Sequence, residues 1–258
     1  MKTTGNTILI TGGSSGIGFA LAKRFNELGN TVLICGRREG RLREAQEAIP
    51  GIAYKVCDVG NAEDRKALFE WAVTENPDLN VLINNGAYQS DYVLTKGAGA
   101  LDGAEDEINV ILTAPIVLNA MFTEHLRHVP DAAIINVTSI LGFMPLATIP
   151  VYCAAKAGFH VYTLVQRKQY EDAGIDIKVF EAPPPRVETE LNAAGRAIAD
   201  PAMLGPKGLE PHEYAEFVIN GFANDELDIF YGKVGEDARF KPRQSVELRR
   251  LFPERVQD

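Results

Sequence analysis

Short apolar, β-rich runs alternate with longer helical patterns along almost the whole chain, and this alternation constrains the fold more than any other feature. The predicted strands lie at 6–11, 31–35, 53–57, 80–84, 132–138, 175–181 and 227–232, and the predicted helices at 16–28, 39–48, 62–75, 104–128, 151–172 and 211–223. Near-continuous apolar strands separated by helices are typical of a parallel sheet with helices on both faces. We therefore expect a single α/β, Rossmann-type doubly wound domain over residues 1–258, with a seven-stranded, mostly parallel sheet.

The composition indicates a globular protein and argues against several functional classes. The 258 residues are 46% apolar, which suffices for a substantial core, and the formal net charge of −9 argues against a general nucleic-acid or membrane-surface binder. The three cysteines lack metal-type spacing, so they are predicted to be reduced, and no metal site is expected. The amino-terminal sequence enters the first strand without a signal-peptide pattern, and no apolar run approaches 18 residues. A cytoplasmic protein is expected.

A glycine-rich turn follows the first predicted strand. Residues 11–18 read TGGSSGIG, with Gly12, Gly16 and Gly18 spaced as G-x-x-x-G-x-G. Such a turn lets backbone N–H groups approach a pyrophosphate, and the following helix adds the positive end of its dipole. The spacing differs from the common G-x-G-x-x-G fingerprint. A tight turn that needs glycine for geometry alone is the alternative, but the position at the start of a βαβ pattern favours phosphate binding.

Two Tyr-x-x-x-Lys pairs occur, Tyr152 with Lys156 and Tyr92 with Lys96. The first pair stands on a predicted helix, where residues four apart share a face, and the second falls in a polar loop. A nearby ammonium lowers the pKa of a phenol and makes it usable as an acid or base. Ser139, after a strand that ends at the same edge, could donate a hydrogen bond to a carbonyl oxygen. Taken alone, the pair on the helix could equally be an ordinary surface pair.

Several motifs occur together in a characteristic order: ITGGSSGIG at 10–18, CDV at 57–59, INNGA at 83–87, INVTS at 135–139, YCAAK at 152–156 and PPPRVET at 183–189. With these motifs the chain resembles the short-chain dehydrogenase/reductase family over nearly its whole length. The glycine turn, ICGRR at 34–38 and the double proline further resemble a bacterial branch named for a D-alanine esterification operon. Ser139 precedes Tyr152 by 13 residues, as is usual in the family, so the resemblance selects Tyr152 and Lys156 over the pair in the loop.

The resemblance implies roles for four catalytic residues. Tyr152 would transfer the proton to or from the substrate oxygen, and Lys156 would lower its pKa and bind the nicotinamide ribose. Ser139 would position and polarise the carbonyl, and Asn109 would hold a water in a proton relay behind Lys156.

The resemblance also implies the residues that bind a nicotinamide dinucleotide. Asp58 would bond the adenine, Asn84 would line the adenosine ribose, and Val187 and Thr189 would anchor the carboxamide. The full set is Gly12, Ser14, Ser15, Gly16, Ile17, Gly18, Arg37, Arg38, Asp58, Val59, Asn84, Asn85, Gly86, Tyr152, Lys156, Val187 and Thr189. A homodimer or homotetramer is implied as well.

The sequence departs from the family pattern at two places. Gly86-Ala87 stands where the family usually has Ala-Gly, and Pro184-Pro185 stands where it usually has Pro-Gly. A proline fixes φ and removes the N–H that glycine would keep, so the second departure predicts a stiffer loop beside the nicotinamide.

The second predicted strand ends in ICGRR, with Arg37 and Arg38 and no acidic residue before Glu39. An NAD-selective site commonly places an acidic side chain here, on the adenosine ribose, whereas a guanidinium binds the 2′-phosphate of NADP. We therefore expect NADP(H) to be preferred, with Arg37 as the main contact and NAD(H) possible. The alternative is that both arginines are a solvated start to the helix at 39–48.

These observations predict an NADP-preferring oxidoreductase that interconverts an alcohol and a ketone or aldehyde. The alternatives are a nucleotide-sugar epimerase or dehydratase, which would hold its cofactor tightly, and a dinucleotide-binding sensor without turnover. Long loops at 86–103 and in a substrate-loop segment near 182–212 follow strands and should flank a small-molecule substrate. Candidate substrate-pocket residues in these and neighbouring loops are Tyr88, Gln89, Leu141, Phe143, Met144 and Arg186.

Overall fold

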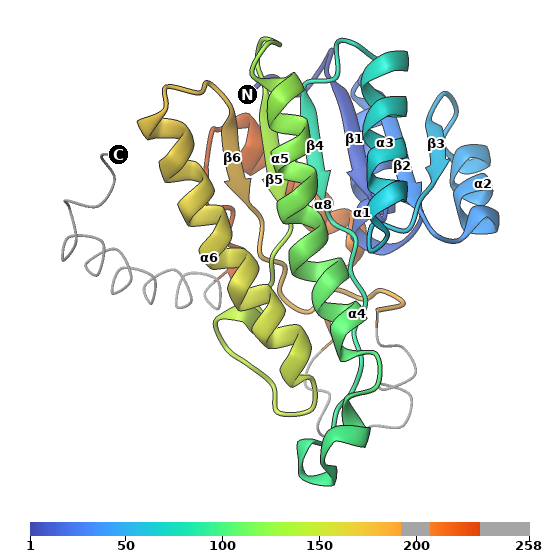
Figure 1. The fold of residues 1–258 in the computed structure, drawn as a ribbon. Coiled ribbons are helices and arrows are strands. Elements are labelled where there is room, and N and C mark those ends of the chain that lie inside the picture. The colour runs from blue at the N-terminus through green and yellow to red at the C-terminus, as the bar shows by residue number, and fades with distance from the viewer. Residues whose placement is uncertain (192–206, 233–258) are drawn as a thin grey trace.

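A parallel sheet of six strands organises the fold. The computed structural model describes residues 1–191 and 207–232. The strands are ordered β3-β2-β1-β4-β5-β6, and every pair of neighbours is parallel (Figure 1). The order changes direction between β1 and β4, as in a doubly wound Rossmann-type sheet, which confirms the predicted fold class. The strands are β1 Thr7–Thr11, β2 Thr31–Gly36, β3 Ala53–Val56, β4 Val81–Asn84, β5 Ala133–Asn136 and β6 Lys178–Glu181.

The prediction of a seventh strand at 227–232 is wrong. This segment makes one isolated parallel bridge, between Asp228 and Glu181. The Glu181 N–H donates to the Leu227 carbonyl, and the Ile229 N–H donates to the Glu181 carbonyl, each at 2.8 Å. In the next step of a parallel ladder, residue 183 would donate to the Ile229 carbonyl, but Pro183 has no N–H, so the pairing ends after one bridge.

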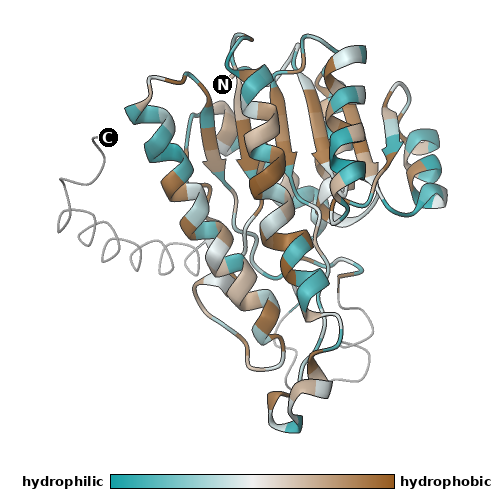
Figure 2. Cartoon of the chain, in the orientation of Figure 1, coloured by the Kyte–Doolittle hydropathy of each residue, from teal (hydrophilic) through white to brown (hydrophobic). Residues whose placement is uncertain are grey.

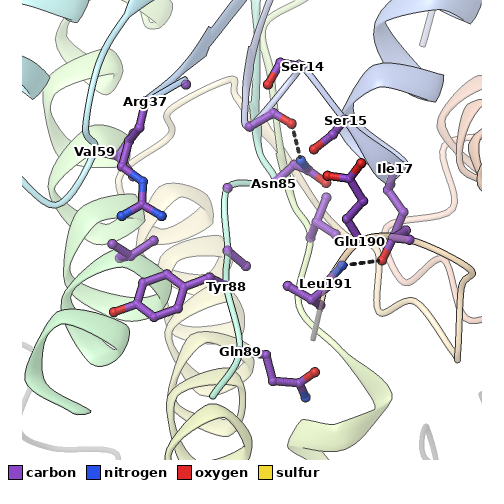
Figure 3. A pocket seen from close by; sticks show the side chains of 18 of the residues that line it. Ser14, Ser15, Ile17, Arg37, Val59, Asn85, Tyr88, Gln89, Glu190 and Leu191 are labelled. Carbon is purple, nitrogen blue, oxygen red and sulfur yellow. Dashed lines mark hydrogen bonds between the residues drawn. The ribbon is translucent and has the colours of Figure 1, made fainter. Parts of the chain in front are cut away.

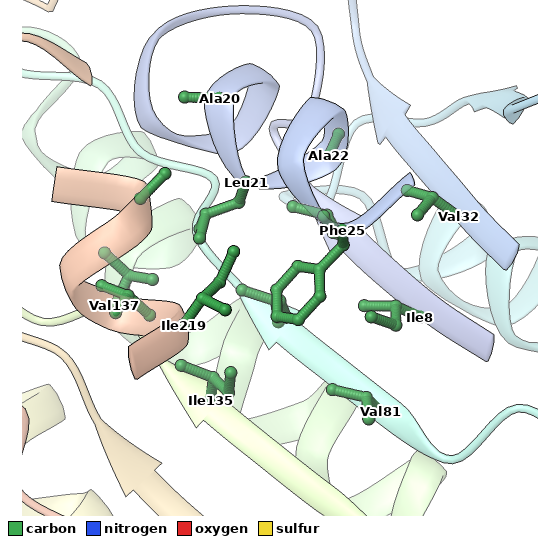
Figure 4. Close-up of a cluster of buried hydrophobic side chains, with 14 of the residues drawn as sticks. Ile8, Ala20, Leu21, Ala22, Phe25, Val32, Val81, Ile135, Val137 and Ile219 are labelled. Carbon is green, nitrogen blue, oxygen red and sulfur yellow. The ribbon is translucent and has the colours of Figure 1, made fainter. Parts of the chain in front are cut away.

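The strand side chains alternate between two apolar cores. Ile8 and Ile10 of β1 face one core, and Leu9 between them faces the other. The first core packs against α1 Gly16–Glu27, α2 Glu39–Ala48 and α8 Pro211–Ala223, and Figure 4 shows Phe25 of α1 inside it. The second packs against α3 Ala62–Glu75 and α5 Ala114–Leu126. Figure 2 shows the apolar strands between helices that carry both apolar and hydrophilic residues. The period of two along each strand therefore explains why helices cover both faces.

The helix predicted at 104–128 is an unbroken helical run over 104–126, but it is not α-helical throughout. It consists of α4 Ala104–Ile108, a π-helical segment η3 Asn109–Thr113, and α5. Pro115 lies just after the π-helical segment, inside this run, where it cannot donate the backbone hydrogen bond that another residue would. The candidate catalytic residue Asn109 thus begins a π-helical segment.

Two helical walls extend the fold beyond the carboxyl ends of the strands. In Figure 1, α4 and the first half of α6 Pro150–Asp172 reach past the strand ends. Short helical turns lie in the neighbouring loops, η1 Leu94–Lys96, η2 Ala98–Leu101 and η4 Ile140–Gly142. Among the helices of the described ranges, none combines the length and apolar character needed to cross a membrane.

Candidate active site

A groove with a volume of about 420 Å³ lies at the carboxyl edge of the sheet (Figure 3). It lies at β1 and β4, the two neighbouring strands between which the strand order changes direction. We call it the carboxyl-edge groove. This is the place where open α/β sheets bind ligands. The residues that line it are Gly12, Ser14, Ser15, Gly16, Ile17, Gly36, Arg37, Arg38, Cys57, Asp58, Val59, Asn85, Gly86, Ala87, Tyr88, Gln89, Val110, Val137, Thr138, Tyr152, Lys156, Pro184, Thr189, Glu190 and Leu191.

The glycine turn forms one wall, and its conformation requires glycine. Gly12 has a φ of 66°, and a Cβ there would lie 2.9 Å from the Gly86 Cα. A Cβ on Gly18 would lie 2.3 Å from the Gly12 carbonyl oxygen. The Asn85 amide donates to the carbonyls of Thr11 and Gly12, at 3.0 and 3.2 Å. Gly18 thus serves close packing outside the groove lining, while Gly12 and Gly16 border the groove at the start of α1.

Arginines form the wall beside β2. The Arg37 guanidinium lies 5.4 Å from the centre of the Tyr88 ring, and both residues face the groove in Figure 3. Arg38 Nη2 lies 3.5 Å from Ser15 Oγ. Arg38 also forms an ion pair with Glu190, at 3.5 Å. The groove therefore has a cationic end beside the glycine turn.

Ser139, Tyr152 and Lys156 come together at the other end. Ser139 follows β5, and its Oγ accepts a hydrogen bond from the Leu141 N–H at the start of η4. Tyr152 and Lys156 lie one turn apart at the beginning of α6 and are only 4% and 3% exposed. Lys156 Nζ donates to the Val137 carbonyl at 2.8 Å and lies 5.7 Å from the centre of the Tyr152 ring. Tyr152 and Lys156 thus line this end of the groove, and Ser139, which hydrogen-bonds the phenol, is not itself a lining residue.

Burial disfavours the charged forms of both titratable groups, Tyr152 and Lys156, and shifts their pKa values accordingly. It raises the pKa of the Tyr152 phenol well above its ordinary value, and a hydrogen bond with Ser139 acts in the opposite direction. It lowers the pKa of Lys156 from 10.5 to about 7. The Lys156 ammonium therefore does not offset the effect of burial on the phenol.

Five predicted site residues lie outside the groove lining: Gly18, Asn84, Asn109, Ser139 and Val187. The Asn109 amide donates to the Gly60 carbonyl at 2.7 Å. The Asn84 amide donates to the side-chain oxygens of Asn119 and Asn136, at 2.6 and 3.0 Å. Asn84 thus belongs to a buried amide network, although it and Lys156 both border a small cavity of about 10 Å³.

The remaining predicted residues divide between the groove and its surroundings. Tyr88 and Gln89 line the groove, whereas Arg186 forms an ion pair with Glu188 at 3.2 Å. Phe143 packs on the His160 ring, with ring centres 4.4 Å apart, and Val187 makes a bridge with Leu209. Leu141 and Met144 are not among the lining residues either. Part of the substrate-loop segment, residues 192–206, lies outside the described residues.

The second Tyr-x-x-x-Lys pair has a different environment. The Tyr92 hydroxyl donates to the buried Glu107 carboxylate at 2.9 Å, and the Tyr92 N–H donates to the Thr148 carbonyl at 3.0 Å. Tyr92 therefore fastens the loop after β4 to α4. It does not line the carboxyl-edge groove.

Sequence reasoning missed several groove residues. Most of them flank predicted ones at strand ends, so their positions could have been found by extending each motif by one or two residues. Glu190 is different in kind, because an acidic side chain is not expected beside a phosphate-binding turn. The missed residues are Gly36, Cys57, Ala87, Val110, Val137, Thr138, Pro184, Glu190 and Leu191. Across residues 1–191 and 207–232, no group of three or more His, Cys, Asp or Glu side chains is arranged to hold a metal ion.

Comparison with solved structures supports the fold. A short-chain dehydrogenase/reductase from Burkholderia phymatum, in complex with NAD, has a TM-score of 0.82 at 20% identity, with 96% of each chain covered. A short-chain dehydrogenase from Sphingobium yanoikuyae, in complex with NADPH, has a TM-score of 0.77 at 26% identity, with 98% of each chain covered.

Comparison with known sequences identifies the family. An uncharacterized oxidoreductase from Bacillus subtilis, DltE, is 47% identical over 89% of each chain, which confirms the resemblance to that bacterial branch. A 3-oxoacyl-[acyl-carrier-protein] reductase from Rickettsia prowazekii is 31% identical over 80% of this chain and 85% of its own. The family model for short chain dehydrogenase matches residues 6–198. The chain therefore belongs to the short-chain dehydrogenase/reductase family and is an oxidoreductase.

Proposed function

We propose that this oxidoreductase prefers NADP(H) and interconverts an alcohol and a ketone or aldehyde, with Tyr152 as general acid and base. One observation carries the proposal. The glycine turn, the arginines of β2 and the buried Tyr152–Lys156 pair all border the same groove. A cofactor held by its phosphates at one end would reach the phenol at the other.

The groove residues fit a nicotinamide dinucleotide. A Cβ on Gly12 would close the approach to the glycine turn, and Ser14, Ser15 and Ile17 present the start of α1 to the groove. Asp58 and Val59 offer a wall for the adenine, and Thr189 offers a contact for the carboxamide. Such a cofactor, when bound, supplies or accepts a hydride. The protein's part is to hold it and to manage the proton.

Tyr152 is the group that donates a proton to the substrate oxygen in reduction and takes it back in oxidation. A buried phenol with a raised pKa keeps its proton until charge develops on that oxygen. The Ser139 hydroxyl would hydrogen-bond the same oxygen and orient the carbonyl. In its ammonium form, Lys156 would stabilise the phenolate.

The proton must be replaced after each reduction. Asn109 was expected to hold a water behind Lys156. The small cavity that Lys156 shares with Asn84 is close to the minimum size for one water, roughly 10–15 Å³. The Asn84 Oδ1 atom is buried and without a hydrogen-bond partner among the described residues. We propose that a water there links Lys156 to Asn84, with Asn109 supporting the wall through Gly60.

The preference for NADP(H) rests on charge. Arg37 and Arg38 border the groove where β2 ends, and Glu39 is the first acidic residue after the strand. A 2′-phosphate would receive charge-assisted bonds there. One good contact is worth about 1.5–3 kcal/mol, or roughly ten- to a hundredfold in affinity. NAD(H) lacks this group and should bind more weakly.

We also propose a homodimer or homotetramer. Val161 and Val165 lie one turn apart on α6 and are 54% and 42% exposed, a small apolar stripe that a second copy could cover.

The proposed cofactor preference is tested by titrating NADPH and NADH into the wild type and an Arg37→Asp variant. The variant should lose NADPH affinity and bind NADH equally well or better. A wild type that prefers NADH, or a variant that binds both cofactors equally less well, would contradict the preference.

The reaction class needs a second measurement. Absorbance of NADPH is followed with panels of ketones, aldehydes and polyols. Net turnover of free cofactor supports an alcohol–carbonyl oxidoreductase. Tightly held cofactor with only transient oxidation would favour an epimerase or dehydratase, and binding without any turnover would favour a sensor.

A further inference from the structure

Glu190 places a carboxylate across the carboxyl-edge groove, directly after the proposed carboxamide anchor Thr189. One oxygen of Glu190 lies 2.8 Å from Arg41 Nη2, and the other lies 3.5 Å from Arg38 Nη1. Figure 3 shows this carboxylate beside Ser15 and Asn85 at the glycine turn. The wall that follows β6 is thereby joined to the start of α2 by two ion pairs.

This arrangement opposes the binding of phosphate at the same place. The Glu190 carboxylate occupies the Arg38 guanidinium, which a 2′-phosphate would otherwise use. The three side chains of the cluster are between 44% and 58% exposed. Exposed ion pairs contribute about 0.2–1 kcal/mol each, so a phosphate that carries more charge can displace the carboxylate. The cluster therefore weakens anion binding without preventing it.

We propose that Glu190 is a specificity-determining residue, which competes with the 2′-phosphate of NADP(H) for Arg38. The inference rests on the proposed function. NADH carries no 2′-phosphate, so it can bind while Arg38 stays paired with Glu190. Arg37 lies over Tyr88 and forms no ion pair within residues 1–191 and 207–232, so it needs no exchange of partners. Glu190 thus sets how strongly the arginine wall discriminates between the two cofactors.

The test is isothermal titration calorimetry on wild type, Glu190→Gln and Glu44→Gln with NADPH and NADH. Glu44 is the matched control, because it also pairs with Arg41, at 3.3 Å, but does not line the groove. Glu190→Gln should tighten NADPH binding about three- to fivefold and NADH binding by less than about 1.5-fold. Glu44→Gln should change either affinity by less than about 1.5-fold. Equal tightening of both cofactors, no tightening, or the same gain from Glu44→Gln would overturn the inference.

A second background separates this inference from the proposed function. In an Arg38→Met chain, Glu190→Gln should give no further gain in NADPH affinity. A persisting gain would show that Glu190 does not act by pairing with Arg38. If wild type prefers NADH but Glu190→Gln still tightens NADPH selectively, the proposed preference fails and the role of Glu190 stands. If neither cofactor binds any of the chains, both fail together.

Discussion

The two edges of the sheet each carry a network of three asparagines, and the networks differ in one respect. At the amino edge, Asn30 Oδ1 accepts hydrogen bonds from the N–H and the amide of Asn6, and the Asn80 amide donates to Asn6 Oδ1. All three amides donate and all three side-chain oxygens accept. At the carboxyl edge, Asn84 donates to Asn119 and Asn136, but its own oxygen has no partner among the described residues.

The comparison separates polar groups that fix the fold from those that remain open to chemistry. A closed network satisfies its members and holds strand ends in register. The open network ends beside the cavity that Lys156 borders, so its spare acceptor lies where a proton path is needed. We therefore expect changes at the amino edge to alter stability alone and changes at the carboxyl edge to alter turnover.

The largest expected effect is at Tyr152. Tyr152→Phe removes the hydroxyl and little volume, so turnover should fall by about 10²- to 10⁴-fold, the usual contribution of a general acid or base. NADPH affinity and the urea midpoint should stay close to the wild-type values. Steady-state kinetics measure turnover, calorimetry measures the NADPH affinity, and urea unfolding gives the midpoint. The matched control is Tyr92→Phe, which should be far milder, and similar losses in both variants would contradict the assignment.

A pair of asparagine variants compares the two edges directly. Asn30→Ala leaves the buried Asn6 N–H and the Thr3 carbonyl without their side-chain partner, so unfolding should become easier by about 2–3 kcal/mol, with kcat unchanged in the folded protein. Asn84→Ala should lower stability by a similar amount and also lower kcat. Urea unfolding and steady-state assays at a temperature where both variants are folded measure these changes. A normal kcat for Asn84→Ala would remove the functional distinction between the edges.

The smallest predicted effect is a pH dependence of stability that comes from Lys156. Its pKa is about 7 in the folded protein and near 10.5 when unfolded, so between these values the unfolded chain binds more protons. Raising the pH from 7 to 9 should therefore stabilise the wild type by about 2 kcal/mol relative to Lys156→Met. Urea midpoints at four pH values, without cofactor, measure the difference. Parallel curves for the two proteins would show that Lys156 keeps its charge when buried.

Strand and helix patterns predicted most of the fold, because apolar periodicity reports which face of an element is buried. Six strands and the helices around them were found from this signal, and the glycine turn was found because Gly12 and Gly18 have no room for a side chain. The seventh strand was wrong, since an apolar run does not show that its neighbour continues into Pro183, which has no N–H for a second ladder step.

The site was less predictable in its side-chain directions. Spacing could place Asn84 at the end of β4, but it could not show that the amide turns into the buried network and away from the groove. The two Tyr-x-x-x-Lys pairs differ through partners distant in sequence, since Tyr92 meets Glu107. Glu190 gave no local signal, because its effect depends on Arg38 and Arg41, about 150 residues earlier in the chain.

The π-helical segment Asn109–Thr113 has a consequence for insertions and deletions. A π-helical turn holds one residue more than the α-helical turn it replaces, and each covers a full 360°. Deleting one residue here would therefore leave a regular α-helix in which α4 and α5 keep nearly the same angular relation. Glu107 would stay on the face that carries it to Tyr92, while the widened turn that begins at Asn109 would be lost. A single deletion between 109 and 113 would thus change the backbone at Asn109 without turning α4 away from its neighbours.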